Sequence, residues 1–209
     1  MKLSKSLPYN TTSKIKGAAK SLFANKGFDS VTVKEIGLKS RSNPALINYH
    51  FGGKKELYYA ILEDFTQIGR ESTRAILKTP QTKHDFIENL NLYIHHLLNR
   101  YLQDPELYLL LNRECEKVLS KSILHRFENQ LLDVFRMLEE FYSCAKKLNL
   151  LKESIDPRFI TLMLFSTLNM LCRRNDLHSK FIGIDLKKSS DFEAIADNLL
   201  HLYGHNLLL

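Results

Sequence analysis

The chain has 209 residues and a formal net charge of +7, and 44% of its residues are hydrophobic, which is ordinary for a globular protein. Pro and Gly are scarce and no long stretch alternates apolar with polar residues, so we expect an all-α fold. The first ten residues hold no apolar run of signal-peptide length, and the apolar stretch 159–172 is too short and too polar to span a bilayer. Cys115, Cys144 and Cys172 lack metal-type spacing, which suits a reducing cytoplasm.

The basic residues are concentrated near the N-terminus. Residues 1–58 hold 11 Lys and Arg against 3 Asp and Glu, a net charge of +8, whereas residues 59–209 hold 19 against 20, a net charge of −1. A segment that binds nucleic-acid phosphates needs such an excess of positive charge. We therefore expect two domains, a DNA-binding domain over 1–58 and a larger helical domain over 59–209.

The first helix is predicted over 13–25, after a basic tail at 1–12. Its apolar residues recur at i, i+3, i+4, i+7 and i+8 and form one stripe that faces a core, namely Ile15, Ala18, Ala19, Leu22 and Phe23. Gly27 is predicted to end this helix because glycine readily adopts positive φ. Phe28 is then placed to fold back onto the apolar stripe.

The segment 31–57 predicts two short helices and the start of a long one. Thr32 can cap the first, with Glu35 three residues later completing a capping box. Asn43 can cap the second, which Pro44 starts and Gly52–Gly53 ends. A long amphipathic helix then begins near Lys54. Two short helices joined by a tight turn are the helix-turn-helix arrangement, whose second helix enters the DNA major groove.

This arrangement assigns roles to individual side chains. Ala45, Asn48 and Tyr49 project from the second helix toward base edges, where Asn can pair with adenine and Ala can contact a thymine methyl group. The residues predicted to hold phosphates and fix the register are Thr32, Lys34, Arg41, Ser42, Asn43, His50 and Lys54.

Residues 15–57 resemble the DNA-binding domain of the tetracycline-repressor (TetR) family of bacterial regulators. The resemblance lies in AAKSLFANKGFDSVTVKEI and in NPALINYHFGGKKEL. The chain departs from the family pattern at Arg41, Ser42 and Asn48, where members usually have Gly, an apolar residue and Tyr. The resemblance implies that the protein is a homodimer that binds a palindromic operator. It also implies that the DNA-binding domain is followed by a helical domain that binds a small ligand.

The rest of the chain predicts helices at 84–102, 104–119, 121–148, 156–174 and 190–206, with a loop at His178–Lys188. Apolar residues surround most of the helix at 156–174, so we expect one side to face its own core and another to face a partner subunit. The alternative is the central helix of a monomer. The residues predicted at the dimer interface are Phe159, Met163, Phe165, Leu168, Ile195 and Leu199.

Few residues indicate other chemistry. Arg113 and Glu114 lie in a Leu-rich helix, so one of them is expected to face inward, in an internal ion pair or toward an acidic ligand. His201 and His205 have metal-ligand spacing but no accompanying Glu, and Cys115 has no identifiable base beside it. We therefore predict no metal, no cofactor and no enzymatic activity.

The sequence thus predicts a cytoplasmic, sequence-specific transcriptional regulator, most simply a homodimeric repressor that a small effector molecule releases from a palindromic operator of double-stranded DNA. Two alternatives stay open. One is a regulator of the same fold without a small-molecule inducer, either an activator or a protein-responsive factor. The other is a helical protein–protein adaptor with a vestigial DNA-binding domain.

Overall fold

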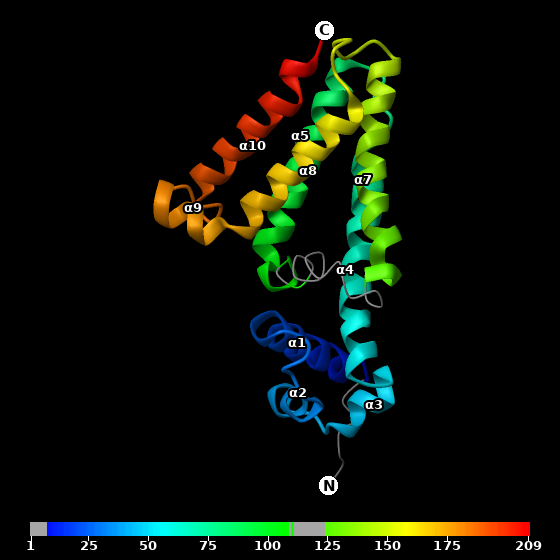
Figure 1. Ribbon diagram of the computed structural model, residues 1–209, viewed down its shortest axis with the longest axis vertical. Coiled ribbons are helices and arrows are strands. Elements are labelled where there is room, and N and C mark those ends of the chain that lie inside the picture. The colour runs from blue at the N-terminus through cyan, green and yellow to red at the C-terminus, as the bar shows by residue number, and fades with distance from the viewer. Residues whose placement is uncertain (1–7, 109, 111–123) are drawn as a thin grey trace.

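The computed structural model describes residues 8–108, 110 and 124–209 (Figure 1). Its regular elements in that part of the chain are helices. The same part also contains one isolated β-bridge, between Leu151 and Leu208. This confirms the predicted all-α fold. The molecule is elongated, with α1 to α3 at one end, the remaining helices at the other, and α4 running between them.

The N-terminal part contains three helices, α1 (Pro8–Lys26), α2 (Val33–Ser40) and α3 (Ala45–Phe51). α1 begins earlier than predicted, so the tail expected up to residue 12 is already helical from Pro8, a residue whose fixed φ suits a first helical turn. Gly27 ends α1 with a φ of 81°, and Phe28 packs on Phe23, both as predicted.

The long helix α4 (Lys54–Ile76) contributes to two hydrophobic cores. Leu57, Tyr58 and Leu62 are buried in the first core, with Ile15, Phe23, Ile36 and Ile47 of the three short helices. Ile76 packs against the second core instead. The first core also includes Leu107 and Leu110. It therefore contains side chains from both of the segments predicted as domains, 1–58 and 59–209.

The second core lies among α5 (Lys83–Gln103), α7 (Leu124–Lys147), α8 (Pro157–Arg173) and α10 (Ser189–Tyr203). Each of these helices agrees with a predicted one. A further helix begins at Pro105, after Asp104, as predicted; residues 109 and 111–119 of the predicted segment lie outside the described residues.

The prediction of a loop at residues 178–188 was wrong in part. Part of the expected loop at His178–Lys188 belongs to a short helix, α9 (Asn175–Ile182). The buried side chain of Asn175 holds the segment after α9, because its Nδ2 donates to Asp185 and its Oδ1 accepts from the Leu186 amide, each at 2.8 Å. These contacts join residues about ten positions apart, which local helix signals do not report.

Among the described residues, no helix is both long enough and apolar enough to cross a membrane.

Candidate DNA-binding interface

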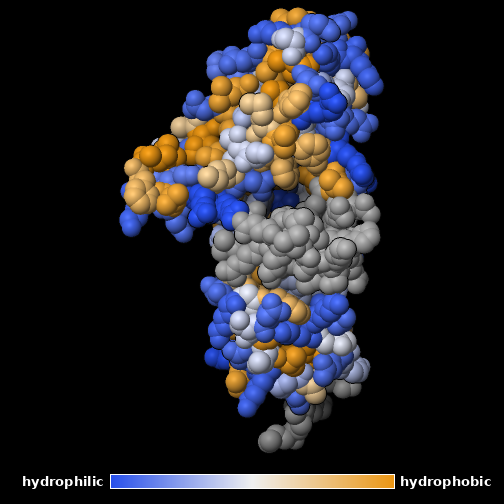
Figure 2. All heavy atoms as spheres, viewed as in Figure 1, coloured by the Kyte–Doolittle hydropathy of each residue, from blue (hydrophilic) through white to orange (hydrophobic). Residues whose placement is uncertain are grey.

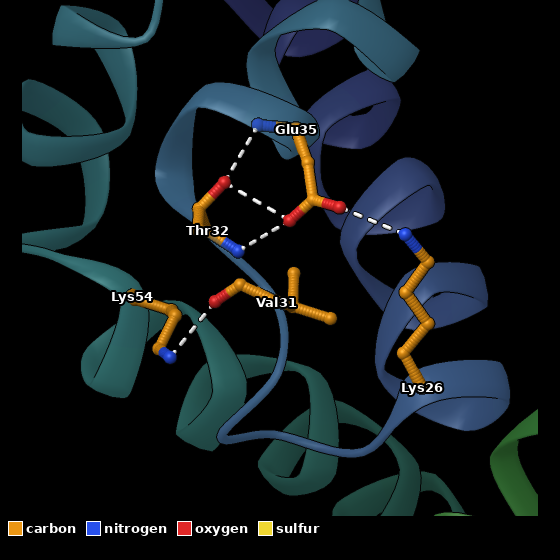
Figure 3. A network of polar contacts seen from close by, with 5 residues as sticks. All are labelled: Lys26, Val31, Thr32, Glu35 and Lys54. Atoms are coloured by element: carbon orange, nitrogen blue, oxygen red, sulfur yellow. Dashed lines mark hydrogen bonds and ion pairs between the residues drawn. The ribbon is translucent and has the colours of Figure 1, made fainter.

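The start of α2 is fixed by the predicted capping box (Figure 3). The Glu35 amide donates to Thr32 Oγ1 at 3.2 Å, and the Thr32 amide donates to Glu35 Oε2 at 2.8 Å. Lys26 at the end of α1 adds an ion pair to Glu35 Oε1, also at 2.8 Å. The hydrogen bond from Lys26, followed by those from Thr32, lowers the pKa of Glu35 to about 2. The carboxylate of Glu35 thus connects two helices and stays ionised at neutral pH.

The turn between α2 and α3 is compact. Arg41 adopts a left-handed conformation with φ 53°, and the Ser42 amide donates to the Gly37 carbonyl at 2.9 Å. A β-carbon on Gly37 would lie only 2.7 Å from Cγ of Pro44. This close approach lets α2 and α3 pack together, and residue spacing alone does not predict it.

α3 presents one side to solvent. The Asn43 side chain caps its first turn by accepting from the Ala45 amide at 2.9 Å, as predicted. Ile47 is fully buried on the inner side, while Ala45, Asn48 and Tyr49 are exposed, the last to 81%. The three residues predicted to meet base edges therefore share an accessible surface on a helix whose opposite side is anchored in the core.

The residues predicted to hold phosphates fall into two groups. Lys34, Arg41 and Asn43 are exposed around the helix-turn-helix, and His50 is partly buried with its ring 4.9 Å from that of Tyr49. The hydroxyls of Thr32 and Ser42 have protein partners instead, at Glu35 and at the Ser40 carbonyl. Their predicted contacts with phosphate would need these bonds to be exchanged.

Lys54 has a role different from the predicted phosphate contact. Its Nζ donates to the Val31 carbonyl at 2.9 Å (Figure 3). It also donates to the Phe28 carbonyl at 3.0 Å and lies 4.3 Å from the centre of the Phe28 ring. The ammonium is thus directed inward and ties the first turn of α4 to the α1–α2 loop. A lysine chain is flexible enough to reach carbonyls on a neighbouring segment, which charge patterning alone did not reveal.

The predicted dimer residues are divided between surface and core. Phe159 and Met163 on α8 are 65% and 55% exposed, whereas Phe165 and Ile195 are partly buried. Leu168 and Leu199 are buried within the subunit's own core, so they leave almost no surface for a partner. Further apolar side chains are exposed nearby, namely Leu162, Met170, Leu177, Phe181 and Ile182. Figure 2 shows hydrophobic side chains over α8, α9 and α10.

Arg113, Glu114 and Cys115, considered for ligand binding or chemistry, lie outside the described residues. The rings of His201 and His205 are 6.3 Å apart, and no group of three or more potential metal ligands occurs in the described part of the chain. Burial raises the pKa of the Cys172 thiol to about 12, which makes that thiol a poor nucleophile at neutral pH.

Known proteins resemble this chain in its sequence and its fold. Residues 15–61 match the family described as bacterial regulatory proteins, tetR family. The HTH-type transcriptional regulator QacR of Staphylococcus aureus is 28% identical over 135 residues, which are 62% of this chain and 69% of that protein.

Two solved structures share the fold. The ketosteroid transcriptional regulator KstR2 of Mycobacterium tuberculosis superposes with a TM-score of 0.73 at 12% identity, over 95% of each chain. The regulator FadR of Bacillus subtilis, in complex with stearoyl-CoA, gives 0.70 at 18% identity, over 92% of this chain and 97% of that one.

Proposed function

Because the chain belongs to the TetR family of bacterial transcriptional regulators, we propose that it is a homodimeric repressor released from a palindromic operator by a small ligand. Regulators of this family are DNA-binding transcription factors and not enzymes, in agreement with the sequence prediction. In this proposal residues 1–58 form the DNA-binding domain, residues 59–209 form the effector and dimerisation domain, and the protein acts in the cytoplasm.

The observation that carries the DNA-binding role is the exposed side of α3. Ala45, Asn48 and Tyr49 are accessible together, and the helix that bears them is anchored through buried Ile47. An α-helix fits the major groove, where amide and methyl groups can distinguish base pairs. Exposed Lys34 and Arg41 supply positive charge beside this surface, as phosphate contacts require.

The exposed apolar side chains of α8 support the homodimer. Phe159, Leu162 and Met163 each expose more than half of their surface. Large contiguous apolar patches are uncommon on monomers and are typical of interaction surfaces. A two-fold axis at α8 would present two α3 helices to two half-sites, about 34–36 Å apart for successive major grooves on one side of the DNA.

Relatives of known structure support the ligand response. The Bacillus subtilis FadR structure holds stearoyl-CoA, and SmeT, the repressor of a Stenotrophomonas maltophilia multidrug efflux pump, has been solved with triclosan. In this chain we assign the corresponding response to the helices after residue 59. Arg113 and Glu114 remain candidate ligand residues by sequence.

The proposed function is tested by sequencing the DNA that co-purifies with the full chain from cells, followed by binding curves on that DNA and on a scrambled duplex. We expect a palindromic site bound by two subunits, with affinity that falls by orders of magnitude over a few-fold rise in salt. Equal affinity for cognate and scrambled DNA, or affinity that does not change with salt, would reject it.

A further inference from the structure

A pocket of about 280 Å³ lies where the N-terminal helices meet the rest of the molecule. Lys16, Gly17 and Lys20 of α1 line one side of it. The other sides come from α4, from the end of α5 and from Leu107. Apolar side chains form much of its wall, namely Ile61, Phe65, Ile68 and Leu107.

Two of the cations that line this pocket are already paired. Lys16 Nζ lies 2.6 Å from Asp64 of α4, and Lys20 Nζ lies 2.6 Å from Asp104 just after α5. Asp104 also accepts from the Leu107 amide at the start of the following helix. These ion pairs connect α1 to α4 and to the segment just after α5. Within each pair the charge of the lysine is neutralised by that of the aspartate.

Among the described residues that line the pocket, Arg100 is the remaining cation, and no carboxylate in that part of the chain forms an ion pair with it. Its Nη2 donates to the Phe65 carbonyl at 3.0 Å, and its guanidinium lies 4.0 Å from the centre of the Phe65 ring. Burial lowers the pKa of Arg100, although arginine in proteins remains charged. The described residues that line the pocket thus carry one excess positive charge, which is partly removed from water.

Gly69 makes this arrangement possible. It lies one turn after Phe65 in the middle of α4, where glycine is less favourable than alanine by about 1 kcal/mol. A β-carbon at position 69 would overlap the Arg100 guanidinium. Because residue 69 has no side chain, Arg100 can reach the Phe65 carbonyl within α4. The glycine that makes room for the guanidinium also lowers the stability of the helix at this position.

We propose that this junction pocket binds a small organic carboxylate with an apolar body, with Arg100 as its counter-ion. The planar guanidinium matches a carboxylate through two parallel hydrogen bonds. The apolar wall formed by Phe65, Ile68 and Leu107 would cover the hydrocarbon or aromatic part of the ligand. The site and the ligand class are thus assigned from one partly buried charge beside an apolar surface.

This proposal deepens the proposed ligand response and rests on it only for the regulatory consequence. A ligand in the pocket would lie beside the Lys20–Asp104 and Lys16–Asp64 ion pairs, which attach α1 to the larger set of helices. A carboxylate held by Arg100 would add a negative charge beside these two ion pairs. Binding at this junction would therefore loosen the attachment of the DNA-binding helices.

The test is calorimetric titration of the full chain with octanoate and with salicylate, each compared with its neutral amide, octanamide or salicylamide. We expect at least one carboxylate to bind at micromolar to millimolar concentration and about tenfold or more tighter than its amide. Arg100→Gln should remove that preference, and Ile68→Asp should weaken the carboxylate by placing a like charge at the exposed pocket wall. Arg74→Gln, an exposed arginine on the same helix α4, is the matched control and should bind as the unaltered chain does.

Equal binding of carboxylate and amide, unchanged binding by Arg100→Gln, or no binding of either carboxylate at millimolar concentration would overturn the proposal. The calorimetry uses no DNA, so its result is independent of operator binding. A chain that binds the carboxylate but no DNA would retain the pocket and reject the proposed function. A chain that binds DNA but neither carboxylate would do the reverse.

Discussion

The ring of Pro44 packs directly against Gly37, at a separation that leaves no room for a side chain between α2 and α3. Pro44 precedes α3 and Gly37 lies within α2, so the contact sets how closely the two helices of the helix-turn-helix approach. The carbonyl of Ser42 lies 3.0 Å from the same β-carbon position, which makes the restriction one of backbone as well as side chain.

Gly37→Ala should therefore destabilise the DNA-binding helices by about 1–3 kcal/mol, the usual range for forcing a methyl group into a packed site. Gly17→Ala is the matched control, because a β-carbon there meets nothing within 4 Å and alanine favours the interior of α1 by about 0.5–1 kcal/mol. Urea unfolding of both variants decides it. If Gly37→Ala were as stable as Gly17→Ala, the contact would not restrict the turn.

We expect Lys54 to contribute to the stability of the fold and Lys34 to contribute to DNA binding. Lys54→Met removes two hydrogen bonds from an ammonium to carbonyls, and we expect a loss of about 1–3 kcal/mol of stability with little change in the salt dependence of DNA binding. Lys34→Ala, at an exposed site, should leave stability nearly unchanged and lower the salt slope by about one unit per subunit. Chemical unfolding and binding curves at three salt concentrations separate the two effects, and a reversed pattern would contradict this assignment.

Asn48→Ala tests base reading. The exposed amide can both donate and accept at an adenine edge, so its loss should weaken cognate DNA by about 1–3 kcal/mol and relax preference at one position per half-site. Binding to scrambled DNA should stay nearly the same. Competition titrations with all four bases at each half-site position provide the measurement. Equal weakening on cognate and scrambled duplexes would show that Asn48 does not read a base.

Glu35 predicts a specific acid response. Its pKa is lowered in the folded chain, from 4.5 to about 2, so the carboxylate stabilises the fold fully above pH 4.5. That stabilisation should decline as the pH falls from 4.5 toward 2, where the carboxylate gains a proton. Glu35→Gln should lose stability at neutral pH and show a weaker decline over this interval. Asp156 titrates over a similar range, so thermal unfolding of the variant must be compared with that of the unaltered chain at each pH.

Phe159→Glu and Met163→Glu test the proposed dimer surface. Both side chains are mostly exposed in the subunit, so the substitutions should leave the fold intact while placing charge on the contact. We expect the dimer dissociation constant to rise by about tenfold or more, measured by analytical ultracentrifugation. Leu92→Glu, at an exposed leucine on α5, is the control and should remain dimeric. Dimers of unchanged stability in both α8 variants would place the interface elsewhere.

Local signals predicted the DNA-binding helices well. The Thr32–Glu35 capping box, the Asn43 cap and the Gly27 stop each depend on residues within a few positions, and each occurs in the structure. Helix start and stop signals also predicted α5, α8 and α10 close to their observed bounds. Such patterns act through the helix itself, so they can be recognised without knowing the tertiary contacts.

The remaining features depend on partners distant in sequence. Lys54 binds carbonyls more than twenty residues away, and Arg100 packs on Gly69 across two helices. The burial of Leu168 follows from the covering helices, since apolar character all round a helix does not indicate which side a partner would use. Positions of this kind are decided by packing and were beyond the reach of spacing and composition.

The two attachments at opposite ends of α4 give the helix a mechanical consequence. Near the start of α4, Lys54 donates a hydrogen bond to the α1–α2 loop, and at its end Ile76 packs against the second core. A helix of 23 residues is about 34 Å long. A rigid rod of that length acts as a lever, so a tilt of about 5° at the far end would displace the DNA-binding helices by about 3 Å. That displacement is comparable with the rise of one base pair, so small rearrangements in the upper helices could change the register of α3 on DNA.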